Sequence, residues 1–163
     1  MPDPRVSYRA PYFDSSVWIA WVMGEVIDGV NRADIARHLL VVAQSGVFKI
    51  HTSTWTMAEV HKKRHFRLLE TEQDQTILRF FEQEFIALIE LDREIGERAN
   101  QIARDFGIAP GDAVHRATAI RAECDVVLAW DGPLTGRTDL PIPVEEPRML
   151  GQLTLPLDRT PDT

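Results

Sequence analysis

The chain has 163 residues, of which 44% are hydrophobic and 26% charged, and its formal net charge is −7. This length suits one domain with a proper core, and the acidic balance argues against a general nucleic-acid coat while leaving open an enzyme that acts on RNA. No apolar run approaches the roughly 20 residues that span a bilayer, the start carries no apolar signal segment, and the single cysteine excludes an internal disulfide. We therefore expect a cytoplasmic protein without a membrane segment.

Strand and helix signals alternate along most of the chain. They predict, in order, a strand at 9–13, a helix at 16–24, a connection at 26–31, a helix at 32–45, a strand at 47–51, a helix capped by 52–54, a helix from 71, a strand within 85–91, helices at 92–107 and 110–120, and a strand at 125–131. This alternation predicts an α/β fold with a mostly parallel sheet between helices. We expect one domain over 1–140, followed at 141–163 by a short edge strand near 142–144 and a Pro/Thr-rich tail.

Acidic residues fall where strands of such a sheet end. Asp14 directly follows the first strand in the stretch YFDSSVW, and Asp131 directly follows the apolar run VVLAW. Asp112 lies in the first turn of the helix before that last strand, and Glu59 lies about two turns beyond the second strand. Each acid alone also has a local explanation as a cap, a turn former or a surface ion pair. Because ligands of parallel sheets bind beyond the carboxyl ends of the strands, however, we expect all four at one rim.

Four carboxylates at one rim raise one another's pKa unless a cation offsets their charge. Mg²⁺ or Mn²⁺ does so through hard oxygen ligands, and such an ion is commonly shared with substrate phosphate. The pattern therefore indicates metal-assisted hydrolysis of a phosphodiester. We expect Asp14, Asp112 and Asp131 to hold the metal, directly or through water, and Glu59 to lie outside them or to bind a second ion.

These residues resemble the PIN domain family, and within it the VapC-type toxins of bacterial toxin–antitoxin pairs. The matching segments are YFDSSVWI with Asp14, TSTWTMAEV with Glu59, and IAPGDAVHRATAIRAECDVVLAWD with Asp112 and Asp131, and together they cover about residues 8–135. The third segment is the most specific, because its run DAVHRATA is typical of these proteins.

The resemblance implies a three-layer α/β/α sandwich and an endoribonuclease that depends on Mg²⁺ or Mn²⁺, the toxin of a type II toxin–antitoxin pair. It also implies an RNA substrate, inhibition by a cognate antitoxin protein, and frequent homodimers. Two alternatives stay open. One is a catalytically silent PIN-like module that binds RNA or a partner protein, and the other is a relative of DNA-directed 5′-nucleases, which the small size and the absence of a helical clamp disfavour.

Four further residues are predicted to contact substrate. Lys62, Lys63 and Arg64 follow Glu59 by one turn, where they would hold the RNA backbone as point charges, although most clusters of this kind are solvated helix faces. Ser16 is expected to bond a metal-bound water or a carboxylate, or else to cap its helix.

Two residues that follow Asp112 are given structural roles. His115 shares a helix face with Asp112, and we expect a packing residue there more than a ligand. Arg116 lies one turn beyond Asp112, which favours an ion pair between them over a phosphate contact. Trp18 and Trp21 are expected in the core or at a subunit interface.

Overall fold

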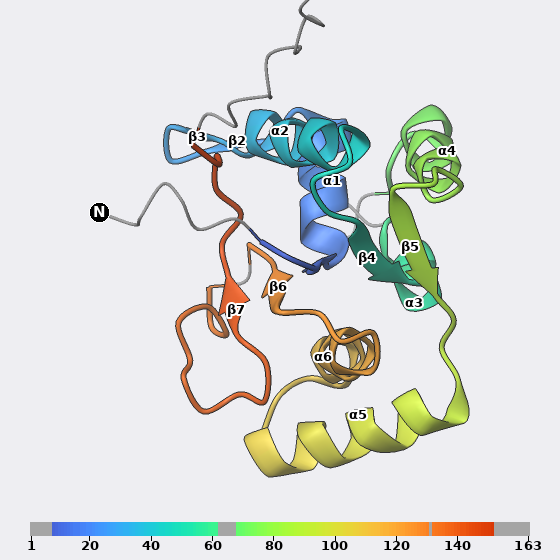
Figure 1. The fold of residues 1–163 in the computed structure, drawn as a ribbon, viewed down its shortest axis with the longest axis vertical. Helices are drawn as coiled ribbons and strands as arrows, with labels where there is room; N and C mark the ends of the chain where they lie inside the picture. Colours follow the sequence, from blue (N-terminus) through green and yellow to red (C-terminus); the bar gives the residue numbers. More distant parts are fainter. Residues whose placement is uncertain (1–7, 62–67, 131, 152–163) are drawn as a thin grey trace, which may run out of the picture.

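A computed structural model of the chain describes residues 8–61, 68–130 and 132–151 (Figure 1). Its elements in chain order are β1 (Pro11–Phe13), α1 (Ser15–Met23), β2 (Val26–Ile27), β3 (Val30–Asn31), α2 (Arg32–Gln44), β4 (Ile50–Ser53), α3 (Thr54–Glu59), α4 (Thr71–Phe80), β5 (Ile86–Ile89), α5 (Arg93–Phe106), α6 (Pro110–Arg121), β6 (Val126–Leu128) and β7 (Val144–Glu145).

The main sheet has five strands in the order β5-β4-β1-β6-β7, and every neighbouring pair is parallel. From β1 the chain moves outward through β4 to β5 and then returns to the other side of β1 with β6 and β7. The order of strands therefore reverses at β1, which is where ligand sites of open parallel sheets form. The predicted α/β fold with a mostly parallel sheet is confirmed, and β7 supplies the edge strand expected near 142–144.

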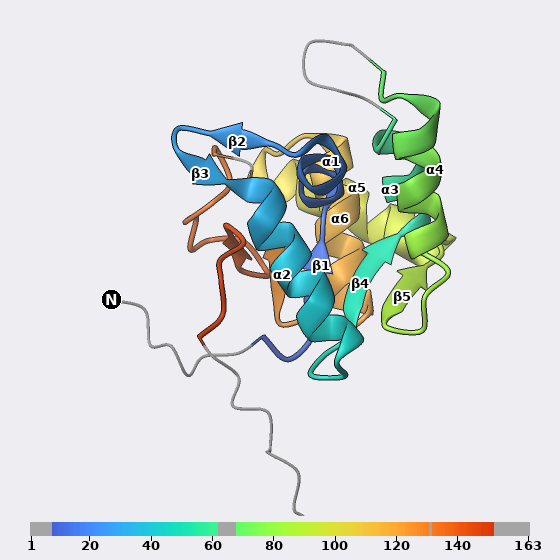
Figure 2. The same ribbon diagram turned by 90° about the horizontal axis from the view of Figure 1, so that it is seen from above.

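Alternate residues of the strands face two separate cores. Phe13 and Leu128 contribute to a core with residues of α1, α2 and α4. Tyr12 and Val127 contribute to a second core with residues of α5 and α6. Viewed from above, α1 and α2 lie nearer to the viewer, with α5 and α6 beyond the sheet (Figure 2). The chain thus forms the three-layer sandwich that the resemblance implies.

The second strand lies further along the chain than the sequence predicts. The expected strand at 47–51 is wrong by about three residues, because β4 spans Ile50–Ser53 and pairs with β5 over that length. Val47 is exposed, whereas Thr52 and Ser53 are fully buried. Ser53 both ends the strand and accepts a hydrogen bond from the Thr56 N–H as the cap of α3. The Ser53 hydroxyl thus caps α3, as predicted, although Ser53 is also the last residue of β4.

A small antiparallel hairpin, β2–β3, forms the connection predicted at 26–31. Val26 pairs with Asn31 and Ile27 with Val30, and Asp28 and Gly29 form the turn with φ of 52° and 77°. Both turn residues occupy the left-handed region, as a two-residue hairpin of type I′ requires, and Asp-Gly is a favoured pair for it. The connection predicted at 26–31 is therefore present, and its two short strands are an addition that the sequence analysis did not predict.

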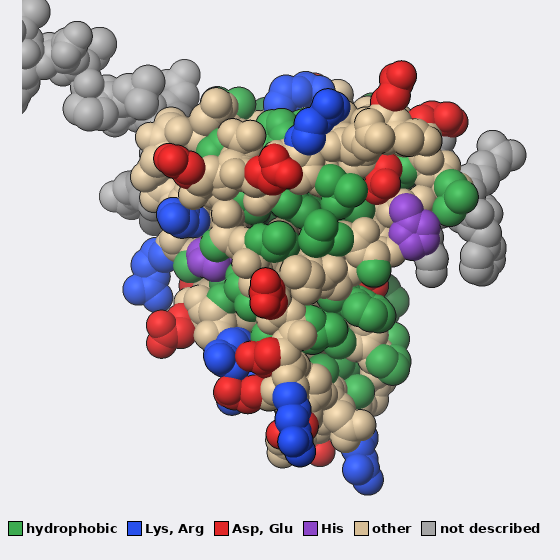
Figure 3. All heavy atoms as spheres, turned by 90° about the vertical axis from the view of Figure 1, so that its right-hand side faces the viewer, with side chains coloured by type: hydrophobic (Ala, Val, Ile, Leu, Met, Phe, Trp, Pro, Cys, Tyr) green, Lys and Arg blue, Asp and Glu red, His purple; other side chains and the backbone are tan. Residues whose placement is uncertain are grey.

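The side of the sheet that ends in β5 presents apolar surface. β5 has a neighbour on one side only in the described sheet. Hydrophobic side chains gather on this face of the molecule (Figure 3), and Leu88 of β5 and Leu91 just after it are exposed. Within the described residues, none of the helices is both long and apolar enough to cross a membrane.

Trp18 is the largest side chain that is fully buried, and it packs edge-on against Phe13 and Phe81 at ring-centroid distances of 5.5 and 4.9 Å. We expect Trp18→Ala to lower the free energy of unfolding by about 3–5 kcal/mol, because the cavity cannot close fully. Urea denaturation measures the change. The matched control, Val41→Ala on the exposed face of α2, is expected to change it by less than ~0.5 kcal/mol. Equal losses for the two variants would contradict this account of the core.

Candidate functional site

Asp14 lies at the carboxyl end of β1 and is hydrogen-bonded to the end of β6 and to the first turn of α1. Its N–H donates to the carbonyl of Leu128 on β6 at 3.2 Å. Its Oδ1 accepts hydrogen bonds from the N–H of Ser16 at 2.9 Å and from the Ser16 hydroxyl at 2.5 Å, so Asp14 caps α1. Both bonds from described residues fall on Oδ1, which leaves Oδ2 for another ligand. Capping and ligation are thus compatible on this side chain.

Asp14 is only 5% exposed, and this burial has the largest effect on its pKa. Loss of water raises the pKa of Asp14, against the opposing effects of the charge on His115, the Ser16 hydrogen bond and the charge on Arg116. A nearby cation is what favours the carboxylate form of such a group.

Ser16 connects Asp14 to the end of β6. Its hydroxyl donates to Asp14 Oδ1, and its Oγ accepts a hydrogen bond from the N–H of Trp130 at 3.0 Å. The single hydroxyl proton of Ser16 is therefore committed to the carboxylate. Of the bonds expected for Ser16, the structure contains the one to a carboxylate, and a contact between Ser16 and substrate stays a prediction.

Glu59, the last residue of α3, is held by a buried chain of side chains. Its Oε2 lies 2.6 Å from Nε2 of His115. The other ring nitrogen of His115, Nδ1, lies 2.7 Å from the hydroxyl of Tyr12, which in turn donates to Ser53 Oγ at 3.1 Å. Burial works to raise the pKa of Glu59, but the hydrogen bond and charge of His115 outweigh it and hold that pKa below its ordinary value.

Glu59 also lies against the first turn of α6. A Cβ atom at Gly111 would stand 3.1 Å from Glu59 Oε1, closer than most such contacts, so the glycine makes room for the carboxylate. Ser15, next to Asp14 in the chain, adds a hydrogen bond that lowers the pKa of Glu59. Glu59 therefore lies between the start of α1 and the start of α6.

Asp112 occupies the first turn of α6, where the helix dipole favours a negative charge. Its Oδ1 lies 3.7 Å from Nη1 of Arg116, and the same Nη1 donates to the Asp112 carbonyl at 2.9 Å. The predicted ion pair between Asp112 and Arg116 is present.

The structure thus gathers Asp14, Glu59 and Asp112 around the first turns of α1 and α6, with about 28% of the Glu59 side chain and 29% of the Asp112 side chain exposed. Asp131, Lys62, Lys63 and Arg64 lie outside the described residues, and their roles stay predictions. Across 8–61, 68–130 and 132–151, no three Asp, Glu, His or Cys side chains lie close enough to hold one metal ion. The side chains placed around these two helix starts carry carboxylate oxygens, and oxygen ligands of this kind fit Mg²⁺ or Mn²⁺.

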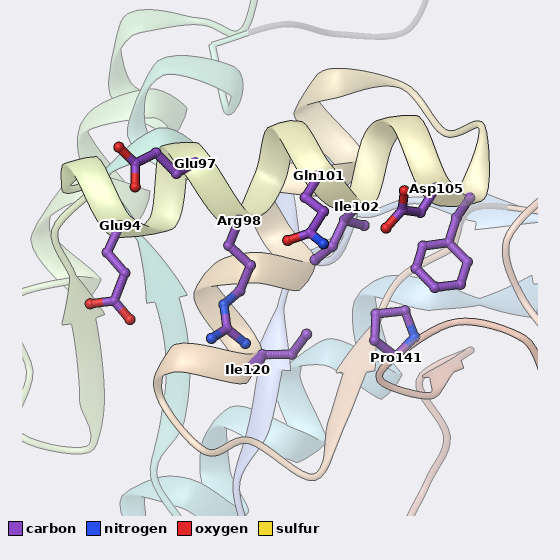
Figure 4. Close-up of a pocket in the computed structure, with 9 residues that line it drawn as sticks. Glu94, Glu97, Arg98, Gln101, Ile102, Asp105, Ile120 and Pro141 are labelled. Atoms are coloured by element: carbon purple, nitrogen blue, oxygen red, sulfur yellow. The ribbon is translucent and has the colours of Figure 1, made fainter.

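A cavity of about 490 Å³ lies elsewhere, between α5, α6 and the segment at Pro141 (Figure 4). Glu94, Arg98 and Asp105 of α5 contribute to its lining. None of the predicted site residues lines this cavity. It is therefore separate from the acidic rim, defined as Asp14, Glu59 and Asp112 at the starts of α1 and α6.

Comparison with known proteins identifies the family. The model of the PIN domain family matches residues 12–132, which include Asp14, Glu59, Asp112 and Asp131. The chain belongs to the PIN domain family, as its resemblance predicts. No curated protein matches it at a significant level.

Solved structures with the same fold include VapC-type proteins. The Mycobacterium tuberculosis VapC20 structure, described as a Sarcin-Ricin loop cleaving toxin, is 17% identical with a TM-score of 0.56, and the match covers 75% of this chain and 90% of that one. VapBC2 from Rickettsia felis, bound to a DNA fragment from its promoter, is 14% identical with a TM-score of 0.57, over 84% and 98% of the two chains. A toxin–antitoxin complex from Klebsiella pneumoniae is 18% identical with a TM-score of 0.56, over 83% and 98%.

His115 is the site residue that sequence reasoning undervalued. It is 2% exposed, as a packing residue would be, yet both ring nitrogens bond to polar partners and one of these is a predicted site acid. Two signals were available in the sequence. His115 shares a helix face with Asp112, and Tyr12 alternates with Phe13 and so points to the opposite side of the sheet from α1.

The pairing of Glu59 with His115 predicts a pH dependence. Since the folded-state pKa of Glu59 is lowered, its contribution to stability is present above the ordinary value of 4.5 and is lost as the pH falls through the folded-state pKa. We expect Glu59→Gln to cost about 1–3 kcal/mol at pH 7, with the difference from wild type shrinking below pH 4.5. Urea denaturation in EDTA across pH 3–7 measures it. Glu97→Gln on the exposed face of α5 is the control, and a cost that stays constant with pH would contradict the assignment.

Proposed function

We propose that the chain is a metal-dependent endoribonuclease that hydrolyses phosphodiester bonds of RNA, and that it acts as the toxin of a type II toxin–antitoxin pair. The observation that carries this proposal is the position of Asp14, Glu59 and Asp112 around the first turns of α1 and α6, in a chain of the PIN domain family. Membership of the family and the VapC-type neighbours support a nuclease above other uses of the fold.

In this proposal Asp14 and Asp112, together with Asp131, hold Mg²⁺ or Mn²⁺, and Glu59 lies in the outer part of the site or binds a second ion. When bound, the ion supplies a deprotonated water and neutralises charge on the reacting phosphate. The chain's own contribution is to hold these oxygens in place. Ser16 fixes Asp14, and His115 with Tyr12 fixes Glu59.

The substrate and partners follow from the same proposal. Lys62, Lys63 and Arg64 stand three to five residues after Glu59 in the chain, so these cations are proposed to bind the RNA backbone. A cognate antitoxin protein and a second copy of the chain are the proposed protein partners, and the cytoplasm is the proposed compartment. The Klebsiella pneumoniae and Rickettsia felis assemblies support the antitoxin.

The proposal predicts that wild-type protein cleaves a structured RNA with Mg²⁺ or Mn²⁺ and that EDTA abolishes the cleavage. Asp14→Asn and Asp112→Asn are each expected to reduce the rate at least ~100-fold, because each removes a negatively charged oxygen from the metal site. Gel analysis of labelled RNA measures the rate. Asn retains the capping oxygen of Asp14, so circular dichroism should show an intact fold.

The matched control is Asp105→Asn, an exposed acid at the cavity beside α5, which is expected to cleave at the wild-type rate. Cleavage that persists in both site variants, after contaminating nuclease is excluded, contradicts the assignment. Binding of RNA by wild type without cleavage under any divalent ion would favour the silent module instead.

The role as a toxin has its own test. Induced expression of wild type is expected to arrest bacterial growth, and co-expression of an adjacent small reading frame to relieve the arrest. Asp112→Asn serves as the control that should leave growth unaffected. Arrest of growth by this variant to the same degree as wild type would argue against toxicity through RNA cleavage.

A further inference from the structure

Arg116 is an arginine enclosed in the protein beneath the acidic rim. The residue is 0% exposed and is one of the largest fully buried side chains. Its Nη1 donates to the Asp112 carbonyl and lies 3.7 Å from the Asp112 carboxylate. Within the described residues, its Nε and Nη2 have no hydrogen-bond partner. The large majority of buried polar side-chain atoms have a hydrogen-bond partner, so two nitrogens without one on the same buried guanidinium are unusual.

A buried cation persists only where negative charge nearby offsets the loss of water. Asp112 is one source, one turn away on α6. Asp14 is a second source, because the charge of Arg116 acts to lower the pKa of this buried carboxyl, after the larger effects of the charge on His115 and the Ser16 hydrogen bond. His115, the neighbouring residue on α6, is already bonded to Glu59 and Tyr12. Arg116 is therefore in direct contact with Asp112 and acts on Asp14 through its charge.

We infer that Arg116 is a built-in counter-charge, a positioning residue that offsets the negative charge of Asp14 and Asp112 in the metal-free protein. Its complete burial rules out direct contact with substrate in this conformation. One consequence rests on the proposed metal site: a resident positive charge beside the acids weakens the binding of a divalent ion, and its removal should strengthen it.

A double-mutant cycle in EDTA at pH 7 tests the inference without any metal. Arg116→Met removes the charge at similar length, and Asp14→Asn removes the carboxylate charge while keeping the capping oxygen. We expect Arg116→Met to lower Tm. The change in Tm caused by Asp14→Asn should be more favourable in the Arg116→Met background than in wild type, by at least about 3 °C. Additive shifts in Tm overturn the inference.

Two controls separate charge from packing. Arg116→Lys keeps the positive charge and should lose less than half as much Tm as Arg116→Met. The pair of Arg116→Met with Asp105→Asn, an acid on the exposed side of α5, should be additive. If Arg116→Met fails to fold, recovery of the folded circular dichroism spectrum in the double variant with Asp14→Asn supports the inference, and a double variant that also stays unfolded overturns it.

Binding of Mn²⁺, followed by electron paramagnetic resonance, tests the consequence for metal affinity. Arg116→Met should bind Mn²⁺ at least about threefold more tightly than the wild-type protein. Equal or weaker binding overturns this part. Wild type that binds no Mn²⁺ argues against the proposed metal site, whereas the cycle in EDTA still decides the role of Arg116.

Discussion

Like charges gathered at the end of a buried strand have to be offset, and this requirement organises the structure around β1. Each acid has its own solution. Asp14 accepts two hydrogen bonds from Ser16, Glu59 is bonded to His115, and Asp112 lies beside Arg116. Helix α6 is central, because it carries Asp112 together with the basic residues His115 and Arg116, and it packs directly against the face of the sheet that Tyr12 occupies. Tyr12, His115 and Ser53 therefore form a hydrogen-bonded polar layer inside the core, and this layer holds Glu59 in place.

The fold follows from local signals wherever those signals are strong. Strands and helices alternate, and the apolar run at β6 and the helix α5 appear where the sequence predicts them. The errors occur where a local pattern competes with pairing at long range. The alternation in VFKIH suits a strand, but the pairing with β5 selects Ile50–Ser53. The turn at Asp28-Gly29 has a favoured sequence for a hairpin, but its strands have only two residues each and so show no alternating pattern.

The acidic rim is predictable for a different reason. Residues that follow parallel strands reach the same edge whatever the details of packing, so Asp14 and Glu59 could be placed from strand ends alone. The polar layer beneath could not be predicted in this way, because it joins β1, the end of β4, α3 and α6 through contacts between residues far apart in the chain. Tyr12, His115 and Ser53 acquire their meaning only when β1 and β4 lie side by side with α6 beneath.

One oxygen of Asp14 accepts both hydrogen bonds from Ser16 and so begins α1. Exchange of the carboxylate for its amide would keep an oxygen for this cap and remove only the negative charge. Codons for Asp and Asn differ by a single nucleotide, so selection for a stable helix start and selection for charge at this strand end can act separately on one residue.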